Sequence, residues 1–552
     1  MNFNKKIYVL LMFAMLICCV SAASATDVDN ITVPDDTNII AEDIVESVDD
    51  VELSDSVSES DDDVSGSDDV EITDQKVIEK ENNRNHPVTV QVYNNNYWNY
   101  FDWQTGMQVV TGVDFNFNGN FNAMPFDMFI INDNNTDIIA TGATFQDVGF
   151  NFNANNAILT GGTFSTTTST NVKHVIDISA GYAEVNGVTM ELNAPNNKEF
   201  VAINVMDGTN TKILNNVITY TCTYTNAGYI NYVIRVKNSP NTVISGNNIT
   251  AYLPLKDVAY YTGATDMDWD QVAAVGIENS NGFNLSYNNI KVNVTDVSGG
   301  YPTLDSVIVL DSEDAYIGYN NITEIDNVTQ PGSANYLYAI DVYRCDKLNI
   351  DNNNIILRSM GGTIIEGTDN GTSTAYGIQL TGGHTVTIAN NDINTKNNGP
   401  NAGIYSQNYG GDTNLTIVNN TIYAEGNAGS HQWSLVTGME LQDNYGYIAG
   451  NKITVYNKQG YVNGSNAYGI SFSQYGNAAP IFNITNNCVN LINGDYAVYI
   501  QYSDLTTYVT NNCLHSTHYT GNNAVYQGAN VYISGNYCCG NCTNCTNCPV
   551  HQ

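Results

Sequence analysis

The segment LNIDNNNIILRS, residues 348–359, carries the pattern that decides the fold: an apolar residue, a short turn, an asparagine, one further residue, and then a β-branched or apolar residue. The repeats follow one another at intervals of about 24 to 41 residues, as expected when loops of different length are inserted into one structural unit. Nine other segments repeat the pattern: TKILNNVITY (211–220), NTVISGNNITAY (241–252), FNLSYNNIKVNV (283–294), AYIGYNNITEI (315–325), VTIANNDINTK (386–396), LTIVNNTIYAEG (415–426), GYIAGNKITVYN (446–457), FNITNNCVNLIN (482–493) and TYVTNNCLHST (507–517).

An asparagine occupies the same place in every repeat. Asparagine tolerates a left-handed backbone conformation, and stacked asparagine side chains can hydrogen-bond to one another. We therefore expect these residues to form a column at one corner of the fold. They are Asn216, Asn247, Asn288, Asn320, Asn353, Asn391, Asn420, Asn451, Asn487 and Asn512, preceded by Asn186 and followed by Asn536.

Each repeat also has a second apolar strand upstream of its asparagine, for example YVIRVK, YAIDVY and YGIQLT. Two or three short strands in a unit of about 30 residues, without helical periodicity, are typical of one coil of a parallel β-helix. The sequence therefore predicts an all-β solenoid, about 65 Å long at ~4.8 Å per coil.

The repeats resemble those of PbH1-type right-handed parallel β-helix proteins, found in adhesin-like surface proteins of methanogenic archaea and in related carbohydrate-binding and carbohydrate-processing proteins. VQVYNNNYWNYFDWQTG (90–106) and FNGNFNAMPFDMFIINDNNTDIIATGATF (117–145) are similar to the start of the β-helix in the adhesin-like proteins. The resemblance covers about residues 87–537. It implies a right-handed β-helix that serves in adhesion, although β-helices also act as lyases, hydrolases and epimerases.

The charge balance excludes one class of partner. The chain has 18 Lys and Arg against 56 Asp and Glu, a formal net charge of -38. So few cations cannot neutralise a row of phosphates, which argues against nucleic acid and, for the same reason, against an anionic membrane surface.

Four regions follow one another along the chain. Residues 1–25 have the basic start, apolar run and small residues of a secretory signal peptide, with an uncleaved N-terminal membrane anchor as the alternative. Residues 26–86 are dense in carboxylates and lack aromatics, which predicts a disordered acidic stalk. Residues 538–552 form a Cys-rich tail. Residues 87–537 form the β-helix, and we expect its first coil to be capped by Tyr97, Trp98, Tyr100, Phe101 and Trp103.

Alignment of the upstream strands gives one outward residue per coil: Asp177, Asn204, Arg235, Glu278, Val309, Asp341, Gln379, Tyr405, Glu440, Ser471, Tyr499 and Tyr526. Carboxylates, amides and tyrosine rings suit sugars, which offer hydroxyls to polar groups and C–H faces to aromatic ones. An inert solvated face is the alternative, because outward strand positions are polar in any case. We expect a glycan-binding face made by Arg235, Glu278, Asp341, Gln379, Tyr405, Glu440, Tyr499 and Tyr526.

Catalysis on the same face is a weaker hypothesis. Glu278 and Asp341 are placed two coils apart, near the ~6.5 to 9.5 Å carboxyl separation of inverting glycosidases. A polysaccharide lyase would need a cation beside acidic groups, and Arg235 next to Glu278, or Arg344 near Asp341, could serve. Arg235 and Glu278 are more simply a cross-strand ion pair. No compact catalytic signature is present, so no catalytic residue is assigned.

Metal ligation has one weak candidate. Asp266, Asp268 and Asp270 alternate in TDMDWDQ (265–271) and could hold Ca²⁺, but the glycine and glutamate of an EF-hand loop are missing. Cys513 with His515 and His518 matches no standard zinc spacing. No cofactor is therefore expected, with Ca²⁺ as the exception.

Cysteines gather in the last repeats and the tail. Cys488 and Cys513 take the same place in neighbouring repeats, within disulfide range at ~4.8 Å. The tail YCCGNCTNCTNCPVHQ (537–552) departs from iron–sulfur spacing by one residue, so cross-linking is the better interpretation outside the cell. The candidates for disulfides or cross-links are Cys488, Cys513, Cys538, Cys539, Cys542, Cys545 and Cys548.

The sequence thus favours a secreted or cell-surface, non-enzymatic β-helix rod that binds extracellular glycans or surface proteins of other cells. A carbohydrate-active enzyme and a purely structural envelope component are the alternatives. A membrane contact is expected only through the N-terminal anchor.

Overall fold

The computed structural model describes residues 86–196, 198–223, 231–257, 272–297, 302–328, 335–359, 374–408, 413–428, 435–442, 444–459, 466–473, 481–501, 506–528 and 530–538. All of them belong to a compact unit that spans Glu81–Gln552. The expected signal peptide or anchor (1–25), the acidic stalk up to residue 85 and the distal part of the Cys-rich tail (539–552) lie outside the described residues, whereas His86 is described. Among the described residues, no helix combines the length and the apolar character needed to cross a membrane.

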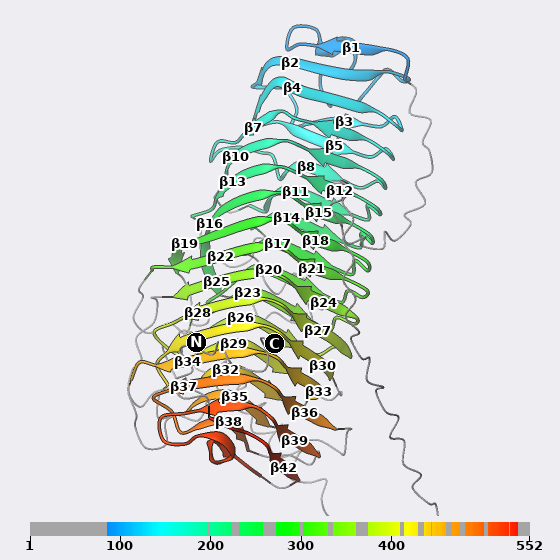
Figure 1. The fold of residues 1–552 in the computed structure, drawn as a ribbon. Helices are drawn as coiled ribbons and strands as arrows, with labels where there is room; N and C mark the ends of the chain where they lie inside the picture. The colour runs from blue at the N-terminus through cyan, green and yellow to red at the C-terminus, as the bar shows by residue number, and fades with distance from the viewer. Residues whose placement is uncertain are drawn as a thin grey trace, which may run out of the picture. The chain divides into compact units, whose positions relative to one another are not determined.

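The described chain is a right-handed parallel β-helix with three strands in each coil, which confirms the predicted fold class. Each strand pairs in parallel with the equivalent strands of the coils before and after it, so that strands stack into three ladders. Figure 1 shows the coils stacked from β1, in blue, to β42, in red.

Ladder 1 holds the predicted upstream strands: β3 (Met128–Ile131), β5 (Gly149–Phe152), β8 (His174–Ile178), β11 (Phe200–Met206), β14 (Asn231–Lys237), β17 (Val272–Glu278), β20 (Pro302–Leu310), β23 (Tyr336–Tyr343), β26 (Thr374–Thr381), β29 (Asn401–Gln407), β32 (Val436–Gln442), β35 (Ala467–Ser473), β38 (Tyr496–Ile500) and β41 (Val525–Tyr526).

Ladder 2 lies just before the anchor asparagines: β1 (Thr89–Val92), β2 (Asp114–Asn122), β4 (Asp137–Gln146), β6 (Ile158–Thr160), β9 (Glu184–Asn186), β12 (Lys212–Leu214), β15 (Val243–Ser245), β18 (Asn284–Ser286), β21 (Tyr316–Gly318), β24 (Leu348–Asp351), β27 (Thr385–Ala389), β30 (Thr413–Val418), β33 (Asn444–Ala449), β36 (Phe482–Thr485), β39 (Thr507–Thr510) and β42 (Val531–Ser534).

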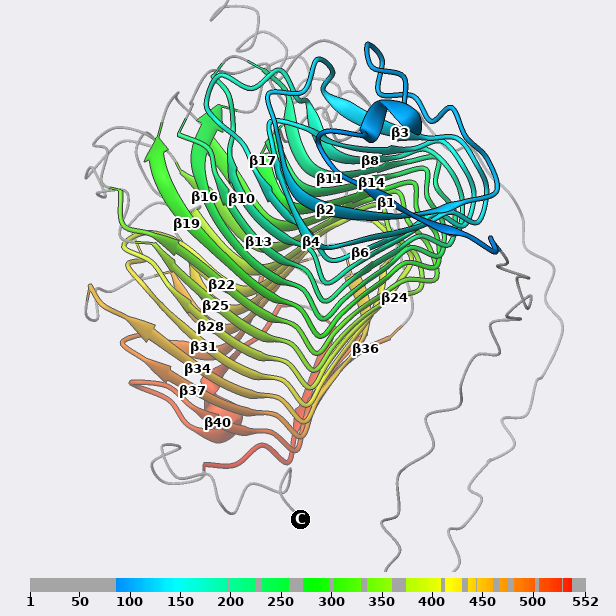
Figure 2. The same ribbon diagram turned by 90° about the horizontal axis from the view of Figure 1, so that it is seen from above.

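Ladder 3 follows the asparagines and includes the second halves of β2 and β4: β7 (Thr163–Ser165), β10 (Thr189–Asn193), β13 (Val217–Thr221), β16 (Asn248–Asp257), β19 (Asn289–Val297), β22 (Asn321–Asp326), β25 (Asn354–Ser359), β28 (Asp392–Lys396), β31 (Thr421–Gly426), β34 (Lys452–Asn457), β37 (Cys488–Ile492) and β40 (Cys513–His515). Two short 3-10 helices, η1 (Tyr97–Asn99) and η2 (Gly521–Ala524), complete the elements. In Figure 2, ladders 2 and 3 meet at a sharp corner and ladder 1 closes the third side.

The predicted asparagine column runs along the corner between ladders 2 and 3. Asn353 is representative: its Oδ1 accepts hydrogen bonds from both the backbone N–H and Nδ2 of Asn320, each at 3.0 Å. Its own Nδ2 donates to Oδ1 of Asn391 at 3.0 Å and to the Ile317 carbonyl at 2.9 Å. Because this pattern repeats from Asn216 to Asn536, neighbouring coils are joined by a buried and saturated amide ladder.

Two details of the predicted column are wrong. The left-handed residue is the one before each anchor, as at Asn352 (φ 55°) and Tyr319 (φ 56°), because the anchor itself must aim its amide inward toward the next coil. Asn186 is not a member, since it aligns with Leu214. The place belongs to Val188, whose N–H donates to Oδ1 of Asn216 at 2.9 Å and so begins the column.

The first coils have an aromatic core. Phe117, Phe129, Phe145 and Phe150 are fully buried, with ring centroids 5.1 to 6.4 Å apart for the contacting pairs. Of the aromatic residues expected to cap the first coil, Phe101 is fully buried and Tyr97 is 8% exposed. Tyr100 is partly buried against the same core. The indole rings of Trp98 and Trp103 are instead 51% and 58% exposed.

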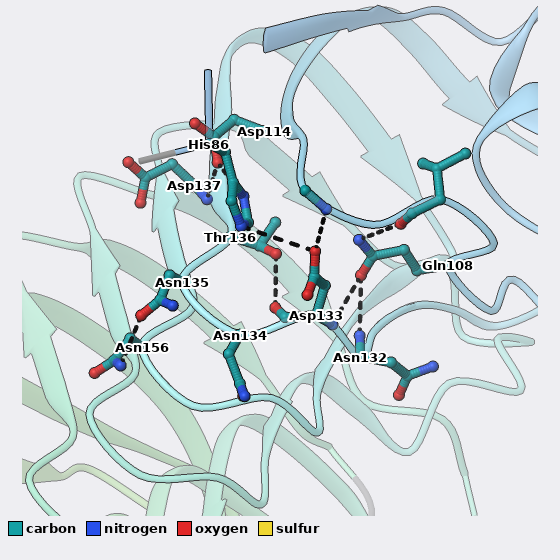
Figure 3. A network of polar contacts seen from close by, with 12 residues as sticks. His86, Gln108, Asp114, Asn132, Asp133, Asn134, Asn135, Thr136, Asp137 and Asn156 are labelled. Carbon is teal, nitrogen blue, oxygen red and sulfur yellow. Dashed lines mark hydrogen bonds and ion pairs between the residues drawn. The ribbon is translucent and has the colours of Figure 1, made fainter. Parts of the chain in front are cut away.

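A polar network ties the start of β1 to the next coils (Figure 3). Nδ1 of His86 lies 3.1 Å from Oδ1 of Asp114, and its Nε2 lies 3.8 Å from Oδ2 of Asp133. The same Asp114 oxygen accepts from the Asp137 N–H at 2.9 Å. Since Asp114 and Asp137 begin β2 and β4, this histidine holds the leading edge of the solenoid to two successive coils.

Ladder 3 carries a carboxyl, Glu324, that faces the core, and Asp326 follows it on the same buried side of β22. Glu324 is fully buried and lies in register with Val292 and Leu357, two core residues of the adjacent coils. Oγ of Ser306 donates to Oε2 of Glu324 at 2.6 Å, and no partner reaches Oε1 among the described residues. Burial raises the pKa of this carboxyl well above its ordinary value.

Candidate functional site

The outer face of ladder 1 carries the residues that the sequence singles out. The central column of this face has one residue per coil, in the order Asp177, Asn204, Arg235, Gly276, Ile308, Asp341, Gln379, Tyr405, Glu440, Ser471, Tyr499 and Tyr526. Seven of the eight predicted face residues therefore do share one column.

The face divides into three zones along the rod.

Two members of the predicted column are misplaced. Glu278 lies two residues farther along its strand, in register with Lys237, whose Nζ is 3.2 Å from Oε2 of Glu278. Gly276 takes the place in the column instead. Glycine has no side chain to mark the outward position, whereas the nearby Glu278 has the polar character that the alignment expects. Val309 points into the core, and Ile308 faces outward instead.

The first zone is a charged cluster that the sequence only partly identified. Nδ1 and Nε2 of His174 lie 3.2 Å from Asp177 and 3.5 Å from Glu199, and Nη1 of Arg235 lies 3.5 Å from Glu199. Burial alone would lower the pKa of His174, but the hydrogen bonds and charges of the two carboxylates raise it to about 9. The cluster therefore pairs its cations with anions within itself.

The middle zone is covered. Glu278 and Asp341 are 1% and 0% exposed although they point away from the core, and Arg235, in the charged cluster beside this zone, is 5% exposed. The last residues of β16 pair antiparallel with the first residues of β20, at the start of that ladder 1 strand. A second apolar cluster lies on the same outer surface and consists of Val201, Tyr232, Ala273, Ile308 and Leu310.

The middle zone does not assemble the catalytic pair considered from the sequence. Glu278 aligns with Tyr343 rather than with Asp341, so two coils and two residues separate the carboxyls, or about 12 Å between backbones at ~4.8 Å per strand and ~3.3 Å per residue. Arg344 holds Asp311 with two hydrogen bonds, each of 2.6 Å, and not Asp341.

The third zone is rich in tyrosine. The rings of Tyr376 and Tyr405 stack with centroids 4.5 Å apart and planes 7° apart. Ala402 stands in register with Tyr376, and its small side chain leaves room for the Tyr405 ring. In a second stack, Tyr468 and Tyr499 lie 4.2 Å apart and Tyr499 and Tyr526 lie 4.8 Å apart.

We call this zone the tyrosine face and define it by its half-buried or exposed outward residues on ladder 1: Tyr376, Tyr405, Gln407, Gln442, Ser471, Tyr496, Tyr499 and Tyr526. All eight side chains end in a hydroxyl or an amide. Such groups can donate and accept hydrogen bonds with the hydroxyls of a sugar.

Glu440 separates the two tyrosine stacks. It lies in register with Tyr405 on one side and Ser471 on the other. The side chain is 8% exposed, and Nε2 of Gln442 donates to its Oε1 at 2.9 Å. Burial raises the pKa of Glu440 to about 7, against a smaller lowering by the Gln442 hydrogen bond.

The cysteine and metal candidates lie apart from this face. Cys488 and Cys513 are in register on ladder 3, and both side chains are buried. Cys538 follows Tyr537, which bridges to Cys513, and is exposed at the end of the solenoid. Cys539, Cys542, Cys545 and Cys548 lie outside the described residues, as do Asp266, Asp268 and Asp270. The expected cross-links stay a prediction.

Comparisons with known proteins find likenesses only among solved structures. No protein-family model and no curated protein sequence matches the chain. Among solved structures, the chain is similar to the periplasmic alginate epimerase AlgG, at 9% identity and a TM-score of 0.31, over 77% of this chain and 84% of that one. It is also similar to an alginate lyase, at 11% identity and a TM-score of 0.30, over 80% of this chain and 88% of that one.

A third similar structure is the catalytic domain of a GH87 α-1,3-glucanase, at 12% identity and a TM-score of 0.28, over 76% of this chain and 64% of that one. At these scores the likenesses carry no conclusion about function. The strand pairing and the side chains of this chain itself define it as a parallel β-helix protein with a tyrosine-rich outer face.

Proposed function

We propose that this β-helix binds carbohydrate on the tyrosine face, outside the cell. The observation that supports the proposal is the pair of tyrosine stacks on consecutive coils of ladder 1, bordered by Gln407, Gln442 and Ser471. Aromatic rings beside amides and hydroxyls are side chains that can bind sugars, because the rings contact C–H groups and the polar groups hydrogen-bond to hydroxyls. The signal-like N-terminus supports export.

A glycan-array screen of the full chain tests the proposal. We expect binding to one family of polysaccharides and its loss in Tyr405→Ala. Tyr508→Ala is the matched control, because Tyr508 also stacks on a tyrosine, Tyr532 at 5.2 Å, but on ladder 2. Silence of the whole array, or equal loss in both variants, would count against a binding face on ladder 1.

A carbohydrate-active enzyme is the second candidate, because a carboxyl whose pKa is about 7 could protonate a leaving group at neutral pH. Within the central column, Asp341 is the carboxylate on the preceding coils that lies nearest to Glu440, and it is three coils away, about 14 Å, beyond the ~9.5 Å limit of known pairs. Reducing-end and unsaturated-product assays on the bound glycan decide between the two. Product formation that Glu440→Gln abolishes would establish the enzyme.

A role in adhesion to other cells, as the resemblance to adhesin-like proteins implies, and a purely structural role in an envelope remain proposals. Adhesion requires the glycan to lie on another cell. A structural component requires no ligand, so the glycan array also separates it from the binder.

A further inference from the structure

Cations are missing from the tyrosine face. Between Tyr336 and Tyr526 the sequence holds six Lys and Arg residues, and none belongs to a strand of ladder 1; the segments outside the described residues add none. The six are Arg344, Lys347, Arg358, Lys396, Lys452 and Lys458.

Several of these cations are already held by carboxylates away from the face. Arg344 binds Asp311 at the end of ladder 1, and Lys347 lies 3.2 Å from Asp314. Lys396 and Lys458 both lie 3.0 Å from Glu425 on ladder 3. Among the residues between Tyr336 and Tyr526, a ligand on the tyrosine face would therefore meet no cation that could hold a carboxylate or a sulfate. Such anions are bound in proteins mainly by Arg and Lys.

What the face offers is hydroxyls and amides. Tyr405 donates from Oη to Oε1 of Gln407 at 2.6 Å, and Gln442 donates to Glu440. Both contacts fix the orientation of polar groups that a sugar hydroxyl can join. The whole chain carries a formal net charge of -38, which repels polyanions at low ionic strength.

We infer that the tyrosine face takes an uncharged polysaccharide, laid along the coils from β26 to β41, and that it rejects polyuronates and sulfated glycans. This inference rests on the proposed function and narrows it to a substrate class. A polymer suits the site because both partners repeat along one axis, so that each further coil adds contacts to the same chain.

Affinity electrophoresis of the full chain tests the inference, in gels that contain mixed-linkage β-glucan, mannan, alginate or polygalacturonate, each at low and high salt. We expect retardation by a neutral polymer, with little dependence on salt, and none by the two polyuronates. Retardation by a polyuronate would overturn the inference and leave the proposed function standing. No retardation in any gel, together with a silent glycan array, would overturn both.

A gain of function sharpens the test. Ser471 lies between Glu440 and Tyr499 in the central column, so Ser471→Lys adds a cation to the face. We expect this variant to gain about tenfold in affinity for alginate at low salt. Thr416→Lys is the control, since Thr416 points outward from ladder 2. Equal gains in both variants would show that overall charge, and not the tyrosine face, decides polyanion binding, and would contradict the inference.

Discussion

The ring of Tyr499 stacks on that of Tyr468 at 4.2 Å between centroids and 16° between planes, although the two residues stand in different columns of ladder 1. The contact joins two successive coils, β35 and β38. Burial raises the pKa of the Tyr468 hydroxyl, and the adjacent Tyr499 raises it further. The stack therefore has a structural role in addition to the proposed one.

Replacement of Tyr499 separates these roles. We expect Tyr499→Ala to lower the free energy of unfolding by about 1 kcal/mol beyond its loss of buried area, the usual value of an aromatic pair. Tyr499→Phe should keep that stability because the ring remains. Chemical denaturation of both variants checks the prediction, and equal destabilisation by the two would show that the hydroxyl rather than the stack matters.

The asparagine column should be costly to interrupt. Asn353→Ala leaves the buried amide of Asn320 and the Ile317 carbonyl without their partner, so we expect a loss of about 3 kcal/mol or more. Asn354→Ala, one residue later, removes only an exposed hydrogen bond of 2.8 Å to Asn321 and should cost about 0.5 kcal/mol or less. Urea denaturation measures the pair. Similar costs at both positions would contradict a special role for the buried column.

Glu324 should destabilise the protein once it must ionise. Its pKa in the folded state is raised, so its contribution to stability is fully present below the unfolded value near 4.5 and is lost as the pH rises toward the folded value. We expect Glu324→Gln to raise the melting temperature in mildly alkaline buffer and to change it little in acid buffer. The same shift in both buffers would show that packing, and not ionisation, is responsible.

Glu440 should also make the protein less stable as the pH rises, over a pH range that its pKa defines. With its pKa raised to about 7, its stabilising contribution falls between pH 4.5 and about 7, by about 3 kcal/mol in total. Glu440→Gln should flatten the stability profile there. Glu425 is the matched control of opposite sign: Lys458 and Lys396 overcome its desolvation and lower its pKa to about 2, so its contribution is lost only in acid. A profile for Glu440→Gln that keeps the wild-type slope would refute the pKa assignment.

The fold could be predicted from sequence because every repeat carries the same local signals for strand, turn and corner. The asparagine, the alternating apolar residues and the turn recur together, and parallel stacking follows from repetition. The register of ladder 1 could not be predicted in full, because Gly276 and Ile308 break the polar pattern of the column. The exposure of the outward side chains could not be predicted either. Arg235 and Asp341 point outward yet are buried, because burial depends on what lies over a residue and not on its alternation along the strand. The ion pair between Glu199 and His174 joins residues from two coils, so no local sequence pattern could predict it.

The most direct test of the central claim is the affinity of the full chain for a neutral polysaccharide, measured by titration calorimetry for wild type, Tyr499→Ala and Tyr508→Ala. If the tyrosine face is the binding site, the first variant loses about tenfold in affinity and the second keeps the wild-type value. An undiminished affinity in Tyr499→Ala, or a loss in Tyr508→Ala alone, would place the site elsewhere and contradict the account.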